Sequence, residues 1–345
     1  MLFESRGLNL NGWIPFRVYW APRGEGDPRQ TPMADWCRFD DIRFTEPFFE
    51  RTMQRAMRHP FRVLFRHQTT LDVLEQRAAT NPGIRPSGFI FHMSRCGSTL
   101  VSGMLATSAA NVVISEAWPV DSVVTADLGH PEVSDDQRMR WLRGIISALG
   151  QPRGGAEHRC FVKFDCWHAL DMPLIRRAFP DVPWVFIYRD PVEVLVSQLK
   201  APAAWTIPGL MPVRAKDSPH VGGLPVLPDE YAAHTLNSIC ESALLALDAT
   251  GLLLNYTELP GAVFTRLADH FNCTFSDEEA AAMRETARFD AKNPGFWFAP
   301  DAADKQRQAT IRARDLSDRW LSDVYRRLKA YSAFYKNGCQ EKKLP

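Results

Sequence analysis

Short apolar runs alternate with longer amphipathic segments over most of the chain after residue 87. Five runs have the length and composition of buried strands: GFIFH (88–92), VVIS (112–115), CFVKF (160–164), WVFIY (184–188) and LLLNY (252–256). Helical patterns begin at Ser98 and cover 135–149, 171–179, 191–200, 229–249, 261–271 and 316–335. Because strands that alternate with helices are typical of βαβ units, we predict an α/β domain with a parallel sheet of about five strands flanked by helices.

Two regions depart from this alternation. Residues 1–86 are rich in Trp, Arg and Pro, and we predict a mixed N-terminal extension before a main domain at 87–345. The extension should contain about one strand, FRVYW (16–20), and two helices, and should shape an acceptor site or a homodimer interface. The Pro/Gly-rich run at 201–228 is long for a loop inside a compact domain, which favours a lid or an acceptor loop.

An arginine stripe is predicted on the helix at 47–67, where four arginines follow each other at near-helical spacing: Arg51, Arg55, Arg58 and Arg62. Such a stripe is usually a solvated face, since long charged side chains cover apolar surface with their stems. The alternative is a grip on an anionic acceptor or a partner.

Composition narrows the class of protein. The net charge of +1 on 345 residues argues against a nucleic-acid-binding surface, and the apolar runs are too short for a membrane span. We see no signal peptide, and the seven cysteines contain no CxxC pair, which favours reduced thiols and a cytoplasmic location. The nine histidines show no metal-ligand spacing, so we expect no metal.

The segment FHMSRCGSTLVSGML (91–105) has the layout of a phosphate-binding loop. Compared with G-x-x-x-x-G-K-[ST], it has His92 at the first glycine and Ser98 at the lysine. The strand, tight turn and helix start remain, and amide hydrogens at a helix start attract anions. Arg95 adds a positive charge that can bind phosphate in a bidentate way. The candidate binding residues are Ser94, Arg95, Cys96, Gly97, Ser98 and Thr99; an ordinary strand–turn–helix connection is the alternative.

A second strand ends in an arginine within WVFIYRDPVEVLVSQLK (184–200). Arg189 leaves the strand, Asp190 is placed as a helix N-cap, and Pro191 takes the first helical position. Ser197 follows about two helical turns later, so Arg189 and Ser197 could close on one anion. The alternative is that Asp190 only caps and Ser197 only points outward.

Together, SRCGST and YRDPVEVLVS resemble the sulfotransferase family over roughly residues 86–335. That family shows a strand–[K/R]-S-G-[ST]-T loop for the 5′-phosphosulfate and, later, R-[DN]-P with a serine about eight residues further on for the 3′-phosphate. The resemblance implies a P-loop NTPase-like fold of the sulfotransferase type, and 3′-phosphoadenosine 5′-phosphosulfate as donor with adenosine 3′,5′-bisphosphate as product. It also implies no metal and a small-molecule or peptide acceptor. Cys96 departs from the family's usual serine; it is either a small packed thiol or a reactive one.

Several residues compete for the chemistry that the resemblance implies. Glu116 follows the second strand and Asp165 lies in FVKFDCWH, where cytosolic members of the family have Lys-x-His; His168 is a third candidate base. The same correspondence gives Lys163 a role at the leaving group, beside Arg95. Lys292 in DAKNPGF is either a donor ligand or a solvated lysine.

Two rival functions remain open. A small-molecule kinase of the same fold would need ATP and Mg²⁺, which the loop without lysine should bind poorly. A non-catalytic nucleotide-binding protein would bind the donor nucleotide without turnover.

Overall fold

The computed structural model describes residues 9–24, 29–211, 213–214 and 227–336. Its main sheet has the strand order β5-β6-β4-β7-β8, and every neighbouring pair is parallel. The strands are β4 (Pro86–His92), β5 (Asn111–Ser115), β6 (Arg159–Lys163), β7 (Trp184–Tyr188) and β8 (Gly251–Asn255). The predicted α/β class and all five predicted strands are confirmed.

Parallel pairing brings the carboxyl ends of these strands to one edge of the sheet. Ser115 pairs with Lys163, Ile90 also pairs with Lys163, and His92 pairs with Ile187. Ligands of open α/β sheets bind beyond the carboxyl ends of the strands. The register therefore gathers the loops that follow β4, β5, β6 and β7 around one place.

The helices flank this sheet, with α4 against β4, β5 and β6, and α15 against β8. Two predicted helices match the structure to the residue, namely α7 (Asp135–Leu149) and α9 (Pro191–Lys200). The others after β4 are α4 (Ser98–Thr107), α5 (Trp118–Val124), α6 (Ala126–Gly129), α8 (Met172–Ala178), α10 (Pro228–Leu245), α11 (Arg266–His270), α12 (Asp277–Thr286), α13 (Ala302–Gln308), α14 (Ile311–Leu316) and α15 (Ser322–Lys336).

Helix starts follow the local signals in the sequence. Asp190 caps α9 by accepting hydrogen bonds from the amides of Val192 and Glu193, and Pro191 occupies the first helical position, as predicted. At α7, Ser134 and Gln137 form a reciprocal capping box. The helix α9 thereby begins directly after Arg189.

The N-terminal region contains an antiparallel sheet of three strands, where we predicted about one. The strands are β1 (Trp13–Pro22), β2 (Gln30–Arg38) and β3 (Arg66–Thr70). The prediction missed β2 and β3 because β2 carries Pro32 and Asp35, residue types that are rare in strands, and β3 is short and polar. Tertiary pairing holds them together; Trp36 Nε1, for example, donates to Thr69 Oγ1 at 2.8 Å.

The single helix predicted at 47–67 is also wrong. Its place is taken by α1 (Phe49–Ala56), α2 (Pro60–Leu64) and the start of β3, and α3 (Asp72–Thr80) follows. Pro60 lacks an amide hydrogen and disfavours a helical conformation at the preceding residue, so the helix ends before it. The four arginines consequently do not form one stripe.

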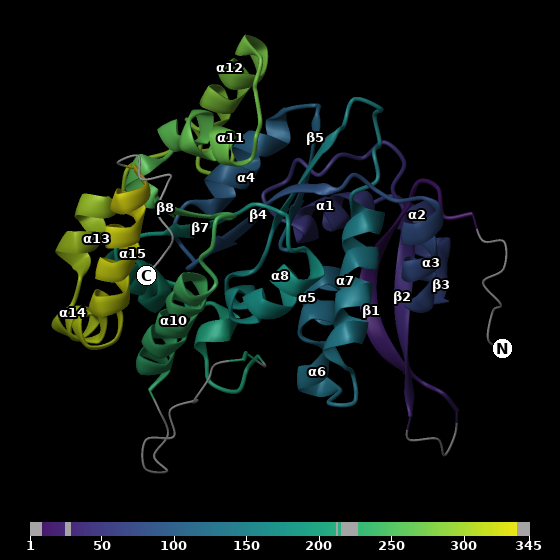
Figure 1. Cartoon of the computed structure of the whole chain (residues 1–345), viewed down its shortest axis with the longest axis horizontal. Helices are drawn as coiled ribbons and strands as arrows, with labels where there is room; N and C mark the ends of the chain where they lie inside the picture. The colour runs from purple at the N-terminus through teal and green to yellow at the C-terminus, as the bar shows by residue number, and fades with distance from the viewer. Residues whose placement is uncertain (1–8, 25–28, 212, 215–226, 337–345) are drawn as a thin grey trace.

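One hydrophobic core runs through both regions of the chain. Helix α5 packs against β1, and α3 packs against α7, so the N-terminal sheet is attached to the main domain through helices. Figure 1 shows β1, β2 and β3 at one end of the molecule and α13, α14 and α15 at the other, with the main sheet between them. The boundary at 86/87 stays a prediction.

The predicted lid at 201–228 lies in good part outside the described residues. Its described portion contains one short helical turn at Ala204–Thr206. Among the described residues, no helix combines the length and the apolar character that a membrane crossing requires.

Candidate functional site

The loop between β4 and α4 has a left-handed backbone at three of its residues. The φ angles are 72° at Ser94, 52° at Arg95 and 87° at Gly97, a region that costs energy for any residue except glycine. A Cβ at Gly97 would lie 2.9 Å from both Leu259 Cδ1 and Tyr256 Cδ2, so glycine is required there for space as well. Such backbone conformations cluster at ligand-binding loops, which favours the phosphate-loop interpretation over an ordinary connection.

The thiol of Cys96 is packed inside the fold. Its side chain is buried, and Sγ donates a hydrogen bond to the carbonyl oxygen of Ile187 at 3.0 Å. Burial raises the pKa of the Cys96 thiol to about 12. The geometry supports the first of the two interpretations, a small packed thiol, since the reactive form of cysteine is the thiolate.

Lys163 ends β6 with its ammonium group inside the site. Nζ lies 2.5 Å from Glu116 Oε1 and 3.2 Å from Thr99 Oγ1, and the side chain has no solvent exposure. It also lies 5.0 Å from the centre of the Phe48 ring, a cation–π contact. Lys163 thus contacts both Thr99, at the start of α4, and the candidate base Glu116.

Lys292 belongs to the same cluster of cations. Burial lowers the pKa of its ammonium group, and the positive charges of Arg95 and Lys163 lower it further. Nζ lies 5.9 Å from the Phe48 ring that also faces Lys163. The carboxylate of Glu116 opposes this lowering, but it already pairs with Lys163 at 2.5 Å, which supports the interpretation of Lys292 as an anion ligand rather than a solvated lysine.

Arg95 points its guanidinium toward the end of α9, where Nη2 donates to the carbonyl oxygen of Ala201 at 2.9 Å. The hydroxyl of Ser94 is buried nearby and accepts a hydrogen bond from Gln198 Nε2 at 3.0 Å. Hydrogen bonds to the end of α9 therefore hold the turn between β4 and α4. Helix α9 itself starts at the second predicted anion-binding segment.

Glu116 follows β5 and is the carboxylate within this group of cations. Its backbone is left-handed, with φ of 51°, and its amide donates to the carbonyl oxygen of Lys163 at 2.8 Å. Burial raises the pKa of the carboxyl, but the Lys163 charge and the hydrogen bond from His92 outweigh it and hold the pKa well below its usual range. Glu116 is consequently ionised at neutral pH.

His92, at the end of β4, connects the loop with Glu116. Nδ1 accepts a hydrogen bond from the amide of Ser94 at 3.1 Å, so the ring proton lies on Nε2. Nε2 is 3.1 Å from the carbonyl oxygen of Phe164 and 3.4 Å from Glu116 Oε1. The buried His92 ring therefore contacts both Ser94 and Glu116, two residues with left-handed backbones.

Asp165 differs from Glu116 in its protonation state. Burial, with the negative charge of Glu116, raises the pKa of Asp165 to about 8. At neutral pH this carboxyl is mostly protonated and cannot accept a proton.

His168, the third candidate base, is completely buried. Its Nε2 lies 2.8 Å from Asp121 Oδ1, and its Nδ1 accepts a hydrogen bond from the amide of Asp165 at 3.3 Å. Ligand atoms of Asp121, Asp165 and His168 lie within 4.8 Å of one another, which is close enough to hold a metal ion. A hydrogen-bonded His–Asp pair accounts for the same arrangement.

Arg189 is fully engaged with carboxylates. Nε lies 2.6 Å from Glu193 Oε2, Nη2 lies 2.7 Å from Asp301 Oδ1, and the guanidinium stacks 4.0 Å from the centre of the Tyr256 ring. Ser197 donates its hydroxyl to the carbonyl oxygen of Glu193 at 2.9 Å. An anion at this segment would have to displace Asp301, whose side chain is 44% exposed.

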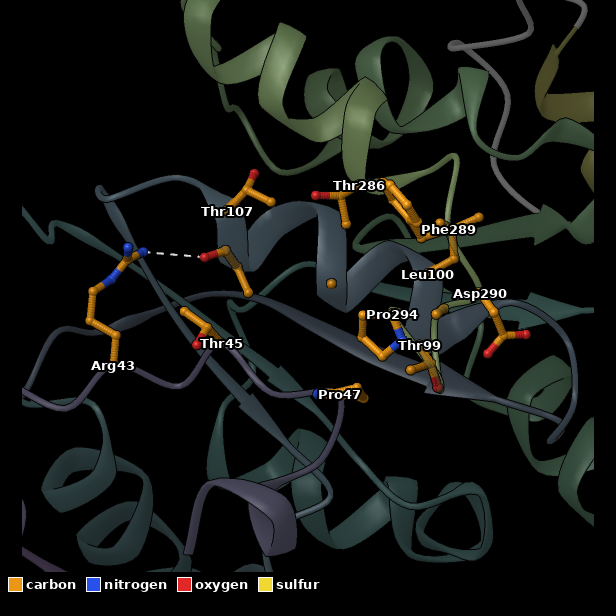
Figure 2. Close-up of a pocket in the computed structure, with 13 residues that line it drawn as sticks. Arg43, Thr45, Pro47, Thr99, Leu100, Thr107, Thr286, Phe289, Asp290 and Pro294 are labelled. Carbon is orange, nitrogen blue, oxygen red and sulfur yellow. Dashed lines mark hydrogen bonds between the residues drawn. The ribbon is translucent and has the colours of Figure 1, made fainter. Parts of the chain in front are cut away.

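A cavity of about 320 Å³ adjoins the phosphate loop on the side of α4. Figure 2 shows Thr45 and Pro47 approaching α4 from the N-terminal segment, and Phe289 and Asp290 approaching from the segment after α12. Thr99 belongs both to this cavity and to the contacts of Lys163. The cavity and the cation cluster therefore share Thr99 as a common neighbour.

Sequence reasoning did not find three of these contributors. Phe48 lies in the N-terminal extension, outside the region that resembles the sulfotransferases. His92 occupies the position of the first glycine in the nucleotide-loop pattern and had no predicted role. Asp301 belongs to no motif in the sequence. The arginines of α1 gave a partial signal, because Arg51 donates to the carbonyl oxygen of Lys292 at 2.6 Å. The N-terminal region thus reaches the candidate site.

A scan of protein-family models finds no match, and no curated protein matches either. Solved structures that resemble this chain include the sulfotransferase STF9 from Mycobacterium avium, at 13% identity over 73% of this chain and 81% of that one, with a TM-score of 0.48. The sulfotransferase domain from the curacin biosynthetic pathway is 16% identical over 76% and 99% of the two chains, with a TM-score of 0.41. Retinol dehydratase in a complex with retinol and PAP is 15% identical over 81% and 89%, with a TM-score of 0.35. At these values the likeness assigns no activity to this chain, and its function is argued from the site.

Proposed function

We propose that the chain is a sulfotransferase that transfers the sulfuryl group of 3′-phosphoadenosine 5′-phosphosulfate to a hydroxyl or amine of a small-molecule or peptide acceptor. The observation that carries this proposal is the cluster of Arg95, Lys163 and Lys292 beside the left-handed loop at the start of α4. A loop that has one buried and two partly exposed cations beside it, and no lysine of its own, suits a donor with a single 5′-phosphate better than the β- and γ-phosphates of ATP with Mg²⁺.

The donor would lie along α4. Loop amides and the hydroxyls of Ser98 and Thr99 would bind the 5′-phosphosulfate at the helix start, and the adjoining cavity would take the nucleoside. The 3′-phosphate would bind Arg189 by displacing Asp301, with Ser197 as a second donor. Both phosphates would then contact the turns that follow β4 and β7.

The chemistry would divide between Lys163 and Glu116. Glu116 would accept the proton of the acceptor hydroxyl while the acceptor oxygen bonds to sulfur and the bond between sulfur and the phosphate oxygen breaks. Lys163 and Arg95 would stabilise the negative charge on the leaving phosphate, typically the largest single contribution to catalysis. Because Lys163 would then share its charge with the donor, the pKa of Glu116 would rise toward that of an effective base.

Calorimetry tests the donor assignment. Adenosine 3′,5′-bisphosphate should bind the wild type more tightly than ATP–Mg²⁺ does, and Arg95→Ala and Lys292→Ala should each weaken that binding about tenfold or more, since hydrogen bonds to charged groups contribute about 1.5–3 kcal/mol. The exposed pair Arg85–Asp181 offers a matched control, and Arg85→Ala should leave the affinity unchanged. Tighter binding of ATP–Mg²⁺ would favour the kinase.

Turnover separates the enzyme from a nucleotide-binding protein. Sulfate-labelled donor should transfer its label to at least one member of a panel of phenols, alcohols, amines and tyrosine peptides, and Glu116→Gln should slow the transfer. Bisphosphate binding without transfer to any acceptor, in the wild type, would support the non-catalytic alternative.

A further inference from the structure

Four apolar side chains lie exposed next to one another in the segment between α1 and β3. Phe61 is 41% exposed, Val63 44%, Leu64 75% and Phe65 57%, and the two phenylalanine rings contact each other with centroids 4.6 Å apart. We name these four residues the Phe61–Phe65 patch. Single exposed apolar residues are normal on protein surfaces, but a contiguous group marks a site of interaction.

The patch is built by local structure and is not part of the core. Helix α2 is a single turn that starts at Pro60, and none of its residues is buried. Arg62 attaches it to β2, where Nε donates to the carbonyl oxygen of Arg38 at 3.0 Å, and the turn is closed by the amide of Phe65, which donates to the carbonyl oxygen of Phe61. The backbone therefore holds the apolar side chains outward.

The surroundings of the patch are strongly cationic. Residues 51–71 contain five arginines and two histidines but neither Asp nor Glu, although the whole chain carries a net charge of only +1. Arg58 and Arg66, on either side of the patch, are exposed. Among the described residues, no carboxylate pairs with Arg58, Arg62 or Arg66, whereas nearby Arg38 pairs with Asp40 at 2.8 Å.

We propose that the Phe61–Phe65 patch docks the protein on an anionic lipid surface. Large apolar side chains framed by arginines can insert at the boundary between headgroups and acyl chains, while the guanidinium groups bind lipid phosphates. A second copy of the chain is a poor occupant, because a two-fold contact would bring the same arginines face to face without carboxylates. The proposal is independent of the sulfotransferase assignment.

Docking would place the candidate site close to the lipid surface. Helix α1 has eight residues and runs from the Arg51 contact with Lys292 to the segment that carries the patch. A helix of that length spans about 12 Å. Only helix α1 and residues 57–60 therefore separate the patch from the contact between Arg51 and Lys292.

Vesicle sedimentation tests the docking with the full chain. We expect binding to phosphatidylcholine vesicles that contain about 30 mole per cent phosphatidylglycerol, little binding to phosphatidylcholine alone, and release by high salt. Leu64→Ser/Phe65→Ser and, separately, Arg58→Gln/Arg66→Gln should each lower the partition coefficient about tenfold or more. Leu245→Ser and Arg85→Gln replace exposed residues elsewhere and serve as controls. Circular dichroism and thermal melts would verify that every variant folds.

Four outcomes would overturn the proposal. The wild type could fail to bind anionic vesicles. Alternatively, the patch variants could bind these vesicles with the same partition coefficient as the wild type. Light scattering could instead reveal a dimer that only Leu64→Ser/Phe65→Ser dissociates, which would make the patch a contact between copies. Binding to an acidic polypeptide such as polyglutamate, lost in the patch variants and without any vesicle binding, would identify a protein partner.

Discussion

The turns after β4 and β7 have the same layout but differ in how far their cations are already paired with carboxylates. Each follows a buried strand, carries an arginine and starts a helix, and the two touch where Arg189 Nη1 approaches the carbonyl oxygen of Arg95 at 3.5 Å. At the first turn, Lys292 lies among cations that lower its pKa. At the second, Arg189 is neutralised by Glu193 and Asp301.

This difference predicts how each turn would bind an anion. Lys163 is paired with Glu116, but among the described residues no carboxylate pairs with Arg95 or Lys292, so an anion could bind these two cations without displacing a partner. An arginine that holds two carboxylates must exchange a partner, and Asp301, which is the more exposed of the two, is the one to leave. The first turn should therefore dominate affinity, and the second should modulate it.

The largest effect should come from removing Lys163, the buried cation at the end of β6 that contacts Thr99 beside the first turn. Lys163→Met leaves the carboxylate of Glu116 buried without its main partner, which should lower the free energy of unfolding by about 3 kcal/mol in urea titrations at neutral pH. The folded-state pKa of Glu116 is depressed, so the pair stabilises above about pH 4.3, the ordinary glutamate value, and this stabilisation fades as the pH falls. The two proteins should converge in acid, and a constant difference down to pH 3 would contradict the ion pair.

A second experiment compares the two carboxylates near Lys163. Glu116→Gln should reduce the transfer rate about 100-fold, whereas Asp165→Asn should change it less than about threefold at pH 7, since that carboxyl is already protonated. The raised pKa of Asp165 means that its protonated form is favoured by folding, so wild-type stability should decline as the pH rises from about 4 to about 8. Asp165→Asn should remove that slope, and a large rate loss in Asp165→Asn would transfer the role of base to Asp165.

The smallest effect tests the exchange at the second turn. Asp301→Asn removes the charge that competes for Arg189, and the affinity for adenosine 3′,5′-bisphosphate should rise about threefold to fivefold, the scale of a partly exposed ion pair. Asp304→Asn, in the helix that Asp301 precedes and paired with Arg307, is the matched control and should change nothing. Weaker binding in Asp301→Asn would mean that Asp301 positions Arg189 and does not compete with the ligand.

Sequence reasoning succeeded where the signal is local. The five buried strands, the helices α7 and α9 and the Asp190 cap all follow from apolar runs, periodicity and capping chemistry within about fifteen residues. It failed at β2 and β3, whose polar residues become strands only because they pair with each other and with β1. The turn between β4 and α4 is also a local motif, and its role as an anion-binding loop stays a prediction.

The sequence by itself determined the α/β alternation, the loop between β4 and α4, and the set of residues that competes for the chemistry. Only the tertiary structure decided how these residues divide: Glu116 is ionised beside Lys163, Asp165 is protonated, Cys96 is packed, and Arg189 is already paired. The physical reason is that the protonation and pairing of a side chain depend on its burial and on charges within a few ångströms. These charges come from segments that lie far apart in the chain, as Glu116 and Lys163 do.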